Sequence, residues 1–178
     1  MSPILGIYAS QISGHLATGN FYSIATINPA GQSSVSFTSI PQTFTHLQIR
    51  VNYFGSDVII PRINGDTGSN YSAHGWRGTS GALSGWNFYN GSNMQWSTSW
   101  VPTSTYAGVV IADFFDYTNT NKYKLSKAIT GCDRASTSGG YDVMSGLWRN
   151  TSAITSITLP IGSGTYGTNS SISLYGVI

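Results

Sequence analysis

The sequence has very few charged side chains and contains no glutamate. Of its 178 residues, only 8 are Lys or Arg and 6 are Asp, so that charged residues make up 8% of the chain. Soluble domains commonly devote about a quarter of their residues to charge, and that charge keeps copies of a protein apart in solution. Gly, Ser, Thr, Asn, Tyr and Trp take the place of the missing charges. This composition favours a component of an assembly, or a binding module, over a freely diffusing enzyme.

Other features that the sequence lacks narrow the class of protein further. The single cysteine, Cys132, excludes a disulfide framework within the chain. No apolar run approaches the ~18 residues that a membrane span needs, and the N-terminus lacks the pattern of a secretion signal. We therefore expect synthesis in a cytoplasm and no membrane partner. The basic residues form no run and the net charge is only +2, so we expect no nucleic-acid partner.

Alternation of apolar and polar residues recurs along the chain and is typical of β-strands. In Thr45–Val51, Leu47, Ile49 and Val51 share one face, and polar residues occupy the other. Clusters of Pro, Gly, Asn and Ser separate such segments at short intervals, as in sandwiches and barrels. The other predicted strands are Phe21–Ile27, Ser33–Phe37, Val58–Ile63, Met94–Trp100, Tyr106–Phe115, Tyr123–Thr130, Tyr141–Arg149, Ile154–Leu159 and Ser171–Val177.

These strands predict an all-β fold: an antiparallel two-sheet sandwich, most simply of jelly-roll type. No window shows a helical period longer than two turns, and strand-favouring residues dominate. Tyr106–Phe115 is apolar on both faces. That pattern indicates either a central strand or a strand at a subunit interface.

The first twenty residues differ from the rest and predict an extended arm and linker (1–20) ahead of the sandwich domain (21–178). Exposing apolar side chains to water costs about 25 cal/mol per Å², so we expect the apolar side chains of this arm to pack against a protein surface. We expect it to dock on a neighbouring subunit; the alternative is that it covers its own sandwich. Its candidate assembly residues are Pro3, Ile4, Leu5, Ile7, Tyr8 and Ile12.

Three patterns that could carry chemistry have simpler explanations. Asn64–Asn70 alternates oxygen-bearing side chains as a calcium loop does, but offers one carboxylate, Asp66, where calcium prefers several; a turn is the simpler interpretation. Asp113 and Asp116 are three apart, which on a strand places them on opposite faces. We therefore expect no catalytic, cofactor-binding or metal-binding residue, and no enzymatic activity.

Aromatic residues gather in one stretch together with amides and an arginine. Sugars are bound by aromatic faces with amides and Arg holding the hydroxyls, so this stretch is a candidate glycan site. The alternative is that the rings fill the core or a subunit interface, where Trp and Tyr are also enriched. The residues concerned are Tyr71, Trp76, Trp86, Phe88, Tyr89, Trp96 and Trp100.

Several phrases, in order along nearly the whole chain, carry a family resemblance. They include Ser2-Pro-Ile-Leu-Gly-Ile7, Thr45-His-Leu-Gln-Ile-Arg50, Asn64-Gly-Asp-Thr-Gly-Ser-Asn-Tyr-Ser72, Ser145-Gly-Leu-Trp-Arg-Asn-Thr151 and Ser173-Leu-Tyr-Gly-Val177. In these the chain resembles small virion-associated proteins of tailed bacteriophages, of decoration or fibre type. The stretch from Gly78 to Thr105, which holds Trp86, Trp96 and Trp100, does not share in the resemblance.

The resemblance implies a non-enzymatic structural protein that is made in the bacterial host and displayed on the virion surface. Such proteins are β-rich and oligomeric, and they have no catalytic residues to carry over. We expect a capsid decoration (cement) or head-fibre protein that forms a homo-oligomer, with a trimer favoured, and contacts other virion proteins such as the major capsid protein. The alternative is a tail-fibre module that recognises host surface glycan.

Overall fold

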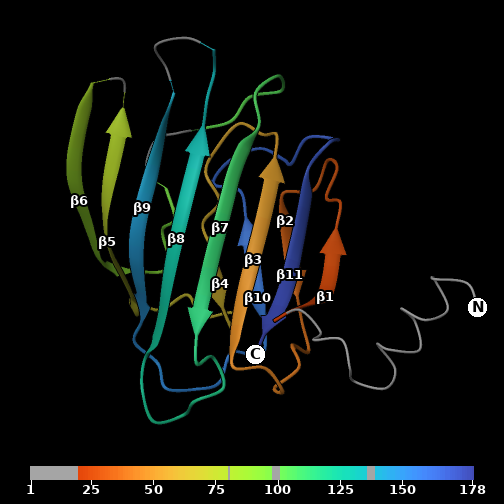
Figure 1. Cartoon of the computed structure of the whole chain (residues 1–178), viewed down its shortest axis with the longest axis vertical. Coiled ribbons are helices and arrows are strands. Elements are labelled where there is room, and N and C mark those ends of the chain that lie inside the picture. Colours follow the sequence, from red (N-terminus) through yellow and green to blue (C-terminus); the bar gives the residue numbers. More distant parts are fainter. Residues whose placement is uncertain (1–19, 80, 98–100, 136–138) are drawn as a thin grey trace, which may run out of the picture.

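The computed structural model describes residues 20–79, 81–97, 101–135 and 139–178. Within these ranges the chain forms eleven β-strands in two antiparallel sheets of eight and three strands, which confirms the all-β, two-sheet fold (Figure 1). The large sheet has the order β1-β11-β3-β7-β8-β9-β5-β6, and the small sheet has the order β2-β10-β4. No helix in the described ranges is long and apolar enough to cross a membrane. The jelly-roll connectivity stays a prediction, and the predicted assembly residues from Pro3 to Ile12 lie outside the described residues.

The strands are short, and the two sheets draw on the whole length of the described chain. In chain order they are β1 (Phe21–Ile27), β2 (Ser34–Phe37), β3 (His46–Tyr53), β4 (Arg62–Ile63), β5 (Tyr71–Thr79), β6 (Ala82–Gly91), β7 (Gly108–Phe115), β8 (Lys124–Cys132), β9 (Gly140–Trp148), β10 (Ile157–Pro160) and β11 (Ser171–Val177).

The hydrophobic core lies between the two sheets, because every second residue of each strand points inward. Leu47 and Ile49 on β3 and Leu174 on β11 are completely buried, and so are Ile157 and Leu159 on the small sheet. Figure 1 shows β2, β10 and β4 behind β3, β7 and β11. The small sheet therefore covers only the inner face of the large one. The opposite, outer face of the large sheet has no second layer among the described residues.

Aromatic rings fill the space above strand glycines that would otherwise leave gaps in the inner face. A Cβ placed on Gly75 of β5 would lie 2.6 Å from the ring of Trp86 on the paired strand β6, and one placed on Gly176 of β11 would lie 2.2 Å from the Phe44 ring. Glycine within a strand often marks such a close approach. These strands thus need glycine because a ring occupies the place of a side chain.

Most strands predicted from alternation are present, and two agree residue for residue, Phe21–Ile27 and Ser171–Val177. Tyr106–Phe115 is also confirmed as a central strand, since β7 is the fourth of eight in the large sheet. The pattern there reflects a buried inner face and an outer face that keeps exposed apolar side chains.

Two strand predictions need correction. Residues 94–97 of the predicted strand Met94–Trp100 form no strand, although Met94 and Trp96 alternate with polar neighbours. They are buried instead beneath the large sheet: the Met94 sulfur accepts a hydrogen bond from Ser126, and the Trp96 ring packs 6.2 Å from that of Phe114. Of the predicted Val58–Ile63, only Arg62–Ile63 is a strand.

The hairpin formed by β5 and β6 was not predicted at all. Its strands contain Gly75, Gly78 and Gly85, and glycine disfavours strands when each residue is judged alone. The aromatic rings that pack over these glycines belong to neighbouring strands, so no local sequence pattern reveals them.

Packing of rings over glycines predicts where an added methyl group is harmful. Gly176→Ala is expected to destabilise the protein by about 1–3 kcal/mol, because its Cβ would overlap the Phe44 ring. Gly131→Ala in β8 is the matched control, since its Cβ would meet its nearest neighbours at 3.7 Å and 3.8 Å, an ordinary contact. Urea unfolding followed by circular dichroism measures both variants. Equal stability of the two would contradict this account.

Burial raises the pKa of the core tyrosines, among them the three residues Tyr53, Tyr71 and Tyr166, and takes that of Tyr71 to about 12. The Tyr166 hydroxyl also donates a hydrogen bond to the carbonyl of Leu159. Unfolded tyrosine loses its proton near pH ~10, whereas the folded protein holds these protons to higher pH. The stability they contribute is therefore complete below pH ~10 and falls as the pH rises further.

We accordingly expect cooperative alkaline unfolding in which ionisation of these three tyrosines coincides with loss of the fold. Tyrosinate absorbance and circular dichroism, recorded together from pH 8 upward, measure the two events. Tyr166→Phe removes one of the linked groups, so its stability should fall less steeply with pH. Ionisation of all 11 tyrosines near pH ~10 in a protein that stays folded would contradict the prediction.

Candidate functional site

The outer face of the large sheet carries large apolar side chains in contact with solvent. Antiparallel sheets that face water usually present polar residues on that side. Here Val109, Ile111, Ile129 and Tyr141 are 48–51% exposed, and Trp76 is 59% exposed. A contiguous apolar surface of this kind marks a place of interaction. Two regions of the face, described in turn below, differ in their chemistry.

The first region lies over β1, β11, β3, β7 and β8, and we call it the assembly surface; it comprises Phe21, Arg50, Val109, Ile111 and Ile129. Ile111 and Ile129 stand directly opposite each other on β7 and β8, and Arg50 is the partner of Ile111 on the other side, on β3. The register thus joins Arg50 and the two isoleucines in one row across three strands.

Arg50 is held in place by rings and by a chain of hydrogen bonds. Its guanidinium lies 5.0 Å from the centre of the Phe21 ring and 4.7 Å from that of Tyr175. Its Nε donates to the side-chain oxygen of Gln48 over 2.6 Å, and the Gln48 amide donates to Asp113 over 2.7 Å. The guanidinium of Arg50 is therefore held in a fixed position at the surface. The hydrogen bonds through Gln48 link it to the carboxylate of Asp113.

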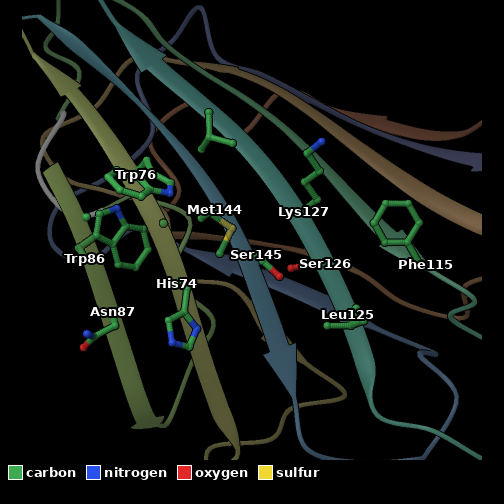
Figure 2. A pocket seen from close by; sticks show the side chains of 13 residues that line it. His74, Trp76, Trp86, Asn87, Phe115, Leu125, Ser126, Lys127, Met144 and Ser145 are labelled. Atoms are coloured by element: carbon green, nitrogen blue, oxygen red, sulfur yellow. The ribbon is translucent and has the colours of Figure 1, made fainter. Parts of the chain in front are cut away.

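The second region is a hollow of about 680 Å³ over β5, β6, β8 and β9 (Figure 2). Each of these strands contributes three consecutive residues to its wall: 74–76, 85–87, 125–127 and 143–145, and Phe115 completes the lining. In each triplet the outer two residues point to the outer face, since side chains alternate along a strand. The hollow is therefore built on the strands of the large sheet, which are held by backbone pairing.

Trp76 on β5 pairs with Gly85 on the edge strand β6. A Cβ placed on Gly85 would lie 3.8 Å from the Trp76 ring, which is an ordinary contact. The indole therefore reaches the neighbouring strand, and more than half of the residue's surface stays open to solvent.

A polar row crosses the hollow beside Trp76. Lys127, Ser145, His74 and Asn87 are consecutive cross-strand partners on β8, β9, β5 and β6. The Nε2 atom of His74 is hydrogen-bonded to the Tyr89 hydroxyl over 2.7 Å, and the two rings meet edge to face. This pairing fixes the imidazole within the row.

The structure divides the aromatic residues that the sequence grouped together. Tyr71 and Trp96 are buried in the core, and Trp86 and Phe88 are partly buried against it. Trp76 and Tyr89 are exposed by more than half, and Trp100 lies outside the described residues. The buried rings therefore fill the core, as one interpretation expected, whereas Trp76 and Tyr89 stay candidates for a glycan site or an interface.

The two carboxylates considered for catalysis have different partners. Asp113 accepts from Gln48, whereas Asp116, directly after β7, pairs with Lys122 and lies 3.6 Å from Nδ1 of His46. In the described ranges, no three His, Cys, Asp or Glu side chains are grouped closely enough to hold a metal ion.

The segment Asn64–Asn70 forms a turn around its carboxylate. Although burial opposes ionisation, hydrogen bonds from Trp148, Asn70 and the Gly68 amide hold the pKa of Asp66 below its usual value. The Asp66 oxygens are thus occupied by donors from the protein itself. The segment is therefore a turn, as the simpler interpretation of the motif expected.

Comparison with known proteins gave no match: no family model, curated protein or solved structure is detectably similar to this chain.

Sequence reasoning identified Trp76 and Tyr89 but missed the rest of the outer face. Ile111 lies on the segment that is apolar on both faces, and this was the one local signal for an apolar outer surface. Lys127, Ser145 and Asn87 have no distinguishing local pattern. Only strand pairing brings them into one row.

Proposed function

We propose that this chain is a non-enzymatic structural protein of a tailed-phage particle, displayed on the virion as a decoration (cement) or head-fibre protein and assembled as a homo-oligomer. The observation that carries the proposal is the assembly surface, an exposed row of Arg50, Ile111 and Ile129 on a sheet with no covering layer in the described chain. The sequence resemblance to virion-associated proteins and the 8% charge support it.

A second copy of this chain is the occupant that fits the assembly surface best. Interfaces between proteins are enriched in aromatic residues and Arg and depleted of other charges, which is the composition found here. Five strands spaced by ~4.8 Å, each of about seven residues at ~3.4 Å, give a footprint of roughly 500 Å² at most, because the ends of β7 and β8 at Phe115 and Lys127 line the hollow. Side-chain relief raises this toward the ~800 Å² that each partner contributes to a standard interface.

In this role the protein would stabilise the particle only by burying surface between neighbouring subunits. Each copy adds contacts across neighbouring subunits of the particle, so that separating them requires exposing apolar surface at about 25 cal/mol per Å². The low charge suits this role, since copies that must touch have little use for mutual repulsion. Contacts to the shell itself, such as the major capsid protein, are assigned to the N-terminal arm in this proposal.

Disrupting the assembly surface should separate the copies without unfolding them. Ile129→Lys is expected to convert the oligomer, for which we expect three copies, into a monomer, because each interface would bury an unpaired ammonium. Leu83→Lys is the matched control: Leu83 is 62% exposed on the edge strand β6, outside the assembly surface. Light scattering after size-exclusion chromatography counts the copies. A monomeric parent chain, or an Ile129→Lys variant that stays oligomeric, would contradict the proposed interface.

The place of the protein in a particle is tested by immunogold labelling of purified virions of the phage that encodes it, with antibody against residues 21–178. The proposal expects gold spread over the heads. Gold confined to the tail tips would instead support the alternative, a tail-fibre module that recognises host glycan. Virions without label, although the protein is made during infection, would refute the virion assignment.

A further inference from the structure

The geometry of the hollow points to a carbohydrate site: we propose that it binds an acidic glycan, with one sugar ring stacked on Trp76 and the polar groups of the glycan held by the row Lys127, Ser145, His74 and Asn87. The site adjoins the assembly surface, since Ile129 pairs with Val143 of its lining, and it applies whether the protein stands on the head or the tail.

Trp76 has the geometry of a stacking platform. It is 59% exposed, although a tryptophan that served packing alone would be covered, as Trp96 is at 1%. The Trp76 ring reaches Gly85, its cross-strand partner on β6. The apolar face of a sugar ring is a good partner for such a surface, because stacking removes apolar area from water while the hydroxyls stay at the rim.

The polar row supplies donors and acceptors at the rim. Adjacent strands lie about 4.8 Å apart, so the row presents one polar side chain at each step across the four strands of the hollow. Within the described residues, no hydrogen bond or ion pair engages the side chains of Asn87, Lys127 or Ser145. They are available to a ligand, whereas His74 is oriented by Tyr89.

The charge of the lining favours a carboxylate on the sugar. Lys127 is the only Lys or Arg in the described lining, and no Asp belongs to it. Asp113, which stands opposite Lys127 on β7, is linked through Gln48 to Arg50, so that two cations flank this one carboxylate. An ammonium in the same hollow as a stacking ring attracts the carboxylate of a uronic or sialic acid, and this is the class we assign.

The size of the hollow suits one or two sugar units. Its volume of about 680 Å³ falls in the range of ~300–1,000 Å³ that is common for small-ligand sites. A single ring and four polar groups give weak binding, but copies displayed together gain about 10²–10⁴-fold through avidity. This gain rests on the self-association proposed above, whereas the intrinsic affinity of each hollow does not.

A glycan array tests the site with the full chain. The probes are immobilised oligosaccharides containing uronic acid or sialic acid, beside neutral ones of equal length. We expect retention on acidic probes that falls at least tenfold in Trp76→Ala and about threefold in Lys127→Gln. Tyr123→Ala is the matched control, because Tyr123 is similarly exposed, at 52%, but does not line the hollow; its retention should be unchanged.

Two further measurements keep the test decisive. Titration of the unmodified chain with the retained oligosaccharide should shift the indole resonance of Trp76 in ¹H–¹⁵N spectra, even if Trp76→Ala fails to fold. A Phe21→Lys variant, if monomeric, should show the same shift, because Phe21 lies on β1, at the other edge of the large sheet from β5 and β6. This variant separates failure of the site from failure of assembly. Absence of retention on every acidic probe, retention on neutral probes alone, or retention that survives Trp76→Ala in a folded variant would overturn the proposal.

Discussion

The large sheet depends on the packing of aromatic rings over glycines of neighbouring strands. Trp86 occupies the space above Gly75 on the inner face, and the Tyr141 ring lies within 2.4 Å of where a Cβ of Gly78 would be. A chain with so few charged residues has few ion pairs to align its strands. Close fit between rings and glycines takes over this role, because a slip of one residue would bring a ring against a side chain.

The candidate site lies on the outer face of the same sheet. Trp76 stands opposite Gly85 at an ordinary contact distance and stays more than half exposed, so its ring is open to a ligand. Strand pairing then places the polar row beside it. The outer face thereby carries, on one continuous sheet, the largely apolar assembly surface and an apolar hollow crossed by a polar row.

Local alternation was sufficient to predict the strands around the core, such as Phe21–Ile27 and Ser171–Val177, because burial of one face imposes a period of two. It failed for the β5–β6 hairpin, where glycines mask the period, and for Met94 and Trp96, where the same period arises in a segment that lies under the sheet. Trp76 could be recognised as a candidate from its residue type. Its polar neighbours could not, since Lys127 and Asn87 meet only through the register of four strands.

The central claim is that the outer face has two parts, one covered by other copies and one left open. Hydroxyl-radical footprinting with mass spectrometry measures it directly, by comparing side-chain oxidation in concentrated, assembled protein with that in dilute, dissociated protein. The account predicts that Phe21, Ile111 and Ile129 lose reactivity on assembly while Trp76 and Tyr89 keep theirs. Unchanged oxidation of the first group, or protection of Trp76, would contradict it.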